Sequence, residues 1–127
     1  MTANEQAGAA TSAPSLAEQA VKLHARLKAL QEPKGYFFSK DTELVMALLE
    51  QLLAIKDKEG YMRCPCRIGS GSYEFDKDIV CPCQYREEDV AEFGSCFCGL
   101  YVSKAWNEGA VPQVQVPERR PPEKIIF

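Results

Sequence analysis

Two stretches of the chain repeat apolar residues at the spacing of an α-helix. In the first, the apolar positions share one helical face and the charged positions lie off it: Leu16, Ala20, Leu23, Leu27 and Leu30. Ser15 is followed three residues later by Glu18, a capping-box pattern, so we expect this helix to begin there. Pro33 and Gly35 are residues that end helices, and they follow the last apolar position.

The second stretch reaches about Lys58, and Gly60 is well placed to end it. Asp41 or Ser39 can cap its start. The aromatic run 36–38, between the two stretches, is expected to fill the core between the helices. Both helices then have an apolar face for packing on each other and for covering a buried centre. The apolar stripe of the second helix consists of Leu44, Leu48, Leu52 and Ile55, widened by Val45 and Leu49.

After Met62 the helical pattern is lost. Residues 67–80 are expected to form a loop with a turn, and they lack the Gly-Lys-Ser/Thr sequence of a phosphate-binding loop. A short helix over 87–93 and a short extended segment over 100–102 follow. From Val111 the chain is rich in proline, which predicts an extended arm or a loose tail with an apolar end that can dock.

These elements predict a small, mainly α-helical single domain. We expect residues 1–14 to form a flexible tail, residues 15–110 the folded domain, and residues 111–127 a proline-rich arm. A chain of 127 residues is long enough for a modest core. A metal centre would add stability that such a core supplies only in part.

The charge pattern excludes some function classes. The net charge is −3 with acids and bases mixed along the chain, and no basic face indicates nucleic acid as a partner. No apolar run approaches the length of a membrane span, and the N-terminus lacks the apolar core of a secretory signal. We therefore expect a cytoplasmic protein. In a reducing compartment, clustered cysteines indicate metal or redox chemistry more often than structural disulfides.

All six cysteines lie between positions 64 and 98, as three Cys-x-Cys pairs: Cys64-Pro65-Cys66, Cys81-Pro82-Cys83 and Cys96-Phe97-Cys98. Four thiolates suit one iron–sulfur cluster or one zinc ion, and two then remain for a disulfide. We interpret the chain as a redox protein with a cluster beside a dithiol. The alternatives are a non-catalytic binding module with a structural zinc or Fe–S site, and an all-disulfide framework. Structural zinc sites usually have Cys-x₂₋₄-Cys spacing, which is missing here.

The sequence Cys64-Pro65-Cys66-Arg67, followed by Cys81-Pro82-Cys83 and Cys96-x-Cys98, resembles the catalytic chain of ferredoxin:thioredoxin reductase. This resemblance extends from the helix before Tyr61 to about Val102. It implies a fold organised around a [4Fe–4S] cluster, electrons from ferredoxin, and thioredoxin or a similar protein as acceptor, and it makes a noncatalytic second subunit a candidate partner. It also implies a role for each sulfur: Cys64, Cys81, Cys83 and Cys96 bind the cluster, Cys66 attacks the target disulfide, and Cys98 lies against the cluster.

The chain departs from the family pattern in the lengths of its two spacers and at Phe97, where the family usually has a histidine that the resemblance links to proton transfer. The single histidine, His24, is expected at the surface or boundary of the first helix. Tyr85, Tyr101, a carboxylate or water remain as proton carriers. Trp106 is expected to be a core or lid residue. Two readings stay open for Arg63, Arg67 and Arg86: they lower the pKa of Cys66 and offset the cluster's charge, or they are solvated.

Overall fold

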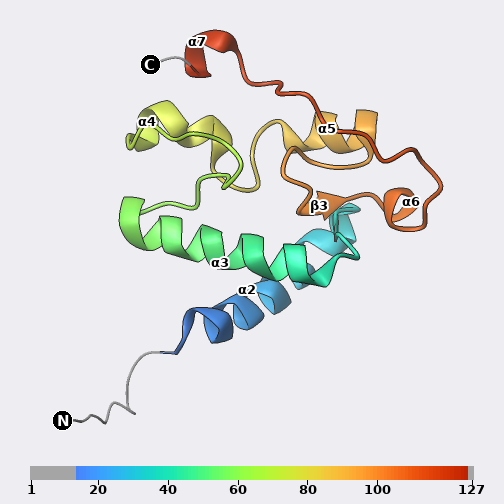
Figure 1. Ribbon diagram of the computed structural model, residues 1–127, viewed down its shortest axis with the longest axis horizontal. Coiled ribbons are helices and arrows are strands. Elements are labelled where there is room, and N and C mark those ends of the chain that lie inside the picture. The colour runs from blue at the N-terminus through green and yellow to red at the C-terminus, as the bar shows by residue number, and fades with distance from the viewer. Residues whose placement is uncertain (1–13, 126–127) are drawn as a thin grey trace.

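Two long helices form the scaffold of the computed structural model, which describes residues 14–125 (Figure 1). Helix α2 (Leu16–Gln31) packs against helix α3 (Thr42–Glu59), and a 3₁₀ turn, η1 (Glu32–Lys34), follows α2. The predicted caps are confirmed. Ser15 and Glu18 form the capping box of α2, and Asp41 accepts the backbone N–H of Leu44 at the start of α3. Gly60, at φ +90°, ends α3.

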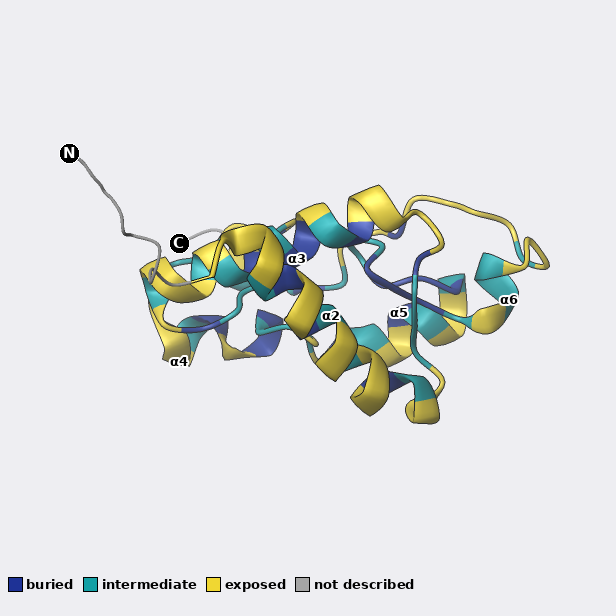
Figure 2. Cartoon of the chain, turned by 90° about the horizontal axis from the view of Figure 1, so that it is seen from below, coloured by how far each residue is buried: buried dark blue, intermediate teal, exposed yellow. Residues whose placement is uncertain are grey.

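The main core lies where these helices meet the segment that carries the last cysteine pair. Buried residues face this core while the outer helix surfaces are exposed, as Figure 2 shows. The predicted apolar faces are confirmed at the centre of each helix and wrong at Leu16 and Leu44, which are exposed, and at Leu30, which is 61% exposed. Gln31 is buried instead of Leu30. The Gln31 side chain faces Arg86 and accepts a hydrogen bond from its guanidinium. The buried part of the core comprises Ala20, Leu23, Val45, Leu48, Leu49, Leu52, Cys96, Leu100 and Tyr101.

A two-stranded antiparallel sheet joins distant parts of the chain. Strand β2 (Phe37–Phe38) pairs with β3 (Tyr101–Val102), so that Phe38 lies opposite Tyr101. The extended segment predicted at 100–102 is thereby confirmed. The aromatic run 36–38 is half-buried, with Phe37 and Phe38 in strand β2, and Tyr36 and Phe38 pack against the core as predicted.

Short helices complete the fold: α4 (Tyr73–Asp76), the 3₁₀ turn η2 (Lys77–Ile79), α5 (Arg86–Phe93), α6 (Lys104–Asn107) and α7 (Pro122–Ile125). Helix α5 confirms the short helix predicted at 87–93. The loop prediction for residues 67–80 is wrong over its second half, which is helical. The buried Asp76 carboxylate organises this turn by accepting hydrogen bonds from Ser70 and from the Tyr61 hydroxyl.

The proline-rich arm runs from α6 back across α5 toward α4 (Figure 1). It has no regular structure before α7, yet Val116 is buried and three consecutive residues form ion pairs with the rest of the molecule. Such contacts contradict the loose-tail reading and agree with an extended arm. The predicted tail (1–14) lies outside the described residues apart from Pro14, and so do the last two residues of the apolar end that was expected to dock. No helix within 14–125 is long and apolar enough to cross a membrane.

Candidate redox site

Backbone hydrogen bonds bring the first two cysteine pairs together. The N–H of Cys64 donates to the carbonyl of Ile79 at 2.8 Å, and the N–H of Cys81 donates to that of Met62 at 2.7 Å. The residues around both pairs therefore form a short antiparallel bridge. Two segments that are separate in the sequence thus present their sulfurs to the same region.

A tight hairpin carries the third pair. The N–H of Cys96 donates to the carbonyl of Tyr101 at 2.8 Å, and Gly99 turns the chain with φ +81° and donates to the Cys96 carbonyl. The N–H of Tyr101 in turn donates to the Cys96 sulfur at 3.3 Å. Because β3 belongs to the sheet, this hairpin fixes the third pair relative to the core.

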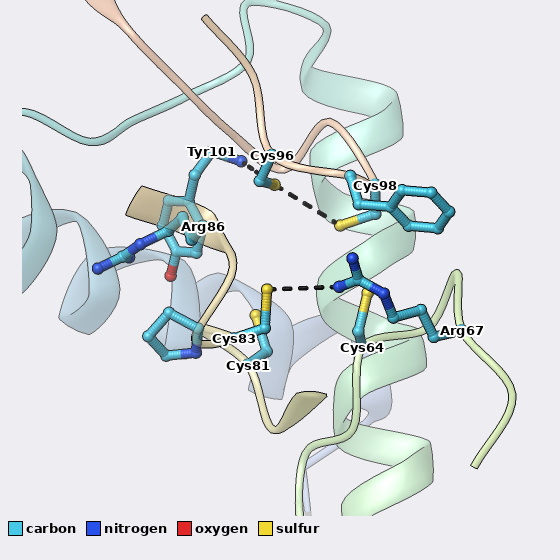
Figure 3. Close-up of a pocket in the computed structure, with 10 residues that line it drawn as sticks. Cys64, Arg67, Cys81, Cys83, Arg86, Cys96, Cys98 and Tyr101 are labelled. Atoms are coloured by element: carbon cyan, nitrogen blue, oxygen red, sulfur yellow. Dashed lines mark hydrogen bonds between the residues drawn. The ribbon is translucent and has the colours of Figure 1, made fainter. Parts of the chain in front are cut away.

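Five of the six cysteines line one pocket, drawn in Figure 3. Cys66 is exposed and does not line it. Cys98 lines the pocket, and its sulfur lies 3.9 Å from that of Cys96. All six cysteines are free thiols in this structure. The pocket lining is Cys64, Arg67, Cys81, Pro82, Cys83, Arg86, Cys96, Phe97, Cys98 and Tyr101.

Interactions between the thiols, together with burial, give the cysteines different pKa values. Hydrogen bonds from Cys64 and Cys98 lower the pKa of Cys66 to about 3, with a smaller contribution from the charge of Arg67. Hydrogen bonds with Cys64, Cys66 and Cys96, in that order of size, raise the pKa of Cys98 well above its usual value. Burial raises the pKa of Cys81 and of Cys83. Cys66 is therefore the thiol that carries charge and is open to solvent.

Arg67 is buried, with 5% of its surface exposed, so the solvated reading of this residue is wrong. Its guanidinium donates to the Cys83 sulfur at 3.4 Å and to both carboxylate oxygens of Glu118. It also lies over the Phe97 ring at 4.4 Å. Although burial disfavours its charge, the hydrogen bonds with Glu118 raise the pKa of Arg67. Arg67 thus places a fixed positive charge at the pocket.

The other two arginines are half-buried and partnered, so the solvated reading is wrong for them too. Arg63 pairs with Glu59 at 3.0 Å and donates to the backbone carbonyls of Cys64 and Arg67, which holds the first cysteine loop in shape. The Arg86 guanidinium lies 3.7 Å from the ring centre of Tyr36 and also near that of Tyr101, another residue that lines the pocket.

Sequence reasoning missed the contribution of the arm. Arg120 is buried, and its guanidinium donates to both carboxylate oxygens of Asp78, which also accepts the Tyr85 hydroxyl at 2.7 Å. Arg119 pairs with the buried Asp89 of α5 at 2.8 Å. No local signal identifies these pairs, because each joins residues at least 30 positions apart.

Several other predicted positions are settled by the structure. His24 is a boundary residue, as predicted, and stacks on Phe38 with 4.5 Å between ring centres. Trp106 lies in α6 and is half-buried beside Gly94, the residue that ends α5. This agrees with a packing role. Tyr85 has its hydroxyl engaged with Asp78, whereas the Tyr101 hydroxyl is buried at the pocket without a hydrogen-bond partner.

The donor set can be compared with the metals considered. Within residues 14–125, no three His, Cys, Asp or Glu side chains come close enough to hold a single metal ion. Thiols are the ligands of iron–sulfur groups, whose cysteines bind different irons. The five cysteines that line the pocket supply this type of ligand.

Comparison with known protein families matches residues 14–119 to the family described as ferredoxin thioredoxin reductase catalytic beta chain. The chain belongs to this family. The resemblance seen in the cysteine motif is thus confirmed, and the match extends from α2 into the arm. Catalytic chains of ferredoxin thioredoxin reductase are oxidoreductases, so the protein is an enzyme of this class, and disulfide reduction is consistent with it. No curated protein matches the chain.

Proposed function

We propose that this protein reduces a disulfide of a partner protein with electrons from ferredoxin. In this proposal Cys66 and Cys98 form the redox-active pair, and Cys64, Cys81, Cys83 and Cys96 hold a [4Fe–4S] cluster. One observation carries the division: Cys66 is exposed and lies outside the pocket, while Cys98 and the other four thiols line it.

The acidities favour Cys66 as the first nucleophile. Its lowered pKa keeps it as a thiolate at neutral pH, and thiolates are the attacking form. Cys66 attacks one sulfur of the partner disulfide, forming a mixed disulfide and releasing one partner thiolate, which takes a proton from solvent. The raised pKa of Cys98 keeps that thiol protonated until then.

Cys98 completes the exchange. Its sulfur attacks Cys66 and releases the second partner thiol, so the partner gains two electrons and two protons and a Cys66–Cys98 disulfide forms. Two electrons and one proton are then needed to reopen this disulfide to the Cys66 thiolate and the Cys98 thiol. A bound [4Fe–4S] cluster would supply the one-electron chemistry that connects ferredoxin to this two-electron step. The Phe97 side chain cannot transfer a proton, and its ring lies against the Arg67 guanidinium.

The overall transfer is favourable. A ferredoxin near −400 mV and a thioredoxin near −270 mV differ by roughly 130 mV, which is about 6 kcal/mol for two electrons. Thioredoxin or a protein with a similar disulfide is therefore a suitable acceptor. We include a noncatalytic subunit as a partner, because the family name describes a catalytic chain. The proposed compartment is the cytosol, where reducing conditions suit exposed thiols.

The test begins with anaerobically purified protein and two matched serine variants. The wild type should be brown, with broad absorbance near 400 nm and about four irons per chain. Cys66→Ser should keep the iron and lose the reduction of thioredoxin by reduced ferredoxin, since only the outer thiol changes. Cys81→Ser should lose the iron.

Two results would contradict the proposal. Equal loss of iron from both variants would show that Cys66 is a ligand and not the attacking thiol. A colourless wild type with one zinc per chain would instead indicate a binding module with a structural metal. Mixing the reduced protein with a panel of thioredoxins then identifies the acceptor.

A further inference from the structure

Three buried polar side-chain atoms have no hydrogen-bond partner among residues 14–125: Asp89 Oδ2, Trp106 Nε1 and the Tyr101 hydroxyl oxygen. Of these residues, Tyr101 alone lines the cysteine pocket. Its side chain is 1% exposed, so water does not reach the hydroxyl freely. Leaving a buried hydroxyl without a partner costs about 1–3 kcal/mol. An acceptor inside the pocket would remove that cost.

The surroundings of Tyr101 keep this hydroxyl in place. Its backbone is paired with Phe38 across the sheet and bonded to Cys96 in the hairpin. Its ring stacks on Phe38 with 5.4 Å between centres, and the Arg86 guanidinium lies 4.9 Å from the ring centre. These contacts hold the ring in one orientation and therefore fix the position of its hydroxyl.

Figure 3 shows where the hydroxyl lies. Tyr101 and Arg86 are on one side of the pocket, Arg67 is on the other, and the sulfurs of Cys81 and Cys83 lie between them. The Tyr101 hydroxyl is thus on the far side from Arg67, which lies beside Phe97. That position suits contact with the group in the pocket and not proton delivery to the exposed Cys66.

We propose that the Tyr101 hydroxyl donates a hydrogen bond to a sulfur atom of the iron–sulfur group held in this pocket. This inference rests on the proposed function. The hydroxyl would join two donors that already reach sulfur: the Tyr101 N–H, bonded to Cys96, and the Arg67 guanidinium, bonded to Cys83. Hydrogen bonds to the sulfurs help set the potential of such groups. Such hydrogen bonds stabilise the additional negative charge of the reduced iron–sulfur group. The Tyr101 hydroxyl therefore makes reduction of the group easier.

The test is Tyr101→Phe, which removes only the oxygen and keeps the ring. In anaerobic protein with equal iron and sulfide, the midpoint potential of the variant should be more negative than that of the wild type. Resonance Raman bands of the Fe–S bonds should shift between H₂O and D₂O less in the variant than in the wild type. Tyr61→Phe is the matched control, because its buried hydroxyl is bonded to Asp76 and it does not line the pocket. The control should keep the wild-type potential.

The outcomes separate the two proposals. If Tyr101→Phe holds the same iron with an unchanged potential and unchanged D₂O shifts, the hydrogen bond does not exist, although the proposed function stands. Wild-type protein that binds no iron–sulfur cluster would overturn both. If the variant does not fold, the wild-type spectrum decides: Fe–S bands that do not move in D₂O contradict the inference.

Discussion

The guanidinium of Arg67 is held by the carboxylate of Glu118, 51 positions later in the chain, through three contacts of 2.8–3.0 Å. The same guanidinium donates to the Cys83 sulfur. One ion pair thus connects the proline-rich arm to the wall of the cysteine pocket. It also satisfies a buried positive charge that would otherwise be costly.

We predict that Glu118→Gln destabilises the protein by about 1–3 kcal/mol, because Arg67 loses a charged hydrogen-bond partner while Glu118 itself is partly exposed. Denaturant unfolding under anaerobic conditions measures the change. Glu123→Gln, an exposed position in the same arm, is the control and should cost far less. Equal effects in the two variants would mean that the Arg67 pair does not anchor the arm.

Arg120→Met should cost about 3–5 kcal/mol, since it leaves the buried Asp78 carboxylate without its bidentate partner and removes the nearby charge from Asp76. The unfolding midpoint in urea gives the value. Arg26→Met, on the exposed face of α2, changes the same atoms without a buried partner and should remain within about 0.5 kcal/mol of the wild type.

Gly69→Ala should destabilise the loop after the first cysteine pair by about 1–3 kcal/mol. A Cβ at this position would overlap the side chain of Arg63, which is fixed by Glu59 and by the loop carbonyls. In an Arg63→Ala background the same change should cost much less, and a double-mutant cycle measures the difference. An equal cost in both backgrounds would place the strain elsewhere.

Phe97→His should make stability depend on pH. The new imidazole would lie beside the Arg67 guanidinium, which contacts Phe97 at 4.4 Å, so the folded state should lower the histidine pKa below its usual 6.5 or so. The unfolded state then binds more protons, and stability relative to the wild type falls as the pH drops through about 6.5. Thermal unfolding between pH 8 and 5.5 tests this. Parallel curves for the two proteins would contradict it.

Local signals predicted the scaffold well. The start of α2 at Ser15 and the limits of α3 at Asp41 and Gly60 depend on residues within a turn of each boundary, so the sequence displays them. Leu30 was misplaced because the periodic pattern does not reveal where the partner surface ends. At that point the neighbour of the helix is Arg86, which needs the polar Gln31.

The site was predictable only in part. The spacing of the cysteines indicated a shared centre, and the family resemblance divided their roles, which remain a proposal. The buried acids and the arm were missed because ion pairs such as that of Arg120 with Asp78 depend on contacts between remote segments. A charged residue in such a pair looks like any surface charge in the sequence. The unpartnered hydroxyl of Tyr101 likewise follows from the sheet register and not from its neighbours.

The position of the arm after the cysteines in the sequence has a consequence for biosynthesis. Translation adds residues from the N-terminus, so all six cysteines leave the ribosome before Glu118 does. Until then Arg67 lacks the carboxylate that holds it. A newly made chain therefore passes through an interval in which all six cysteines have been synthesised but Glu118, which holds Arg67 at the pocket, has not.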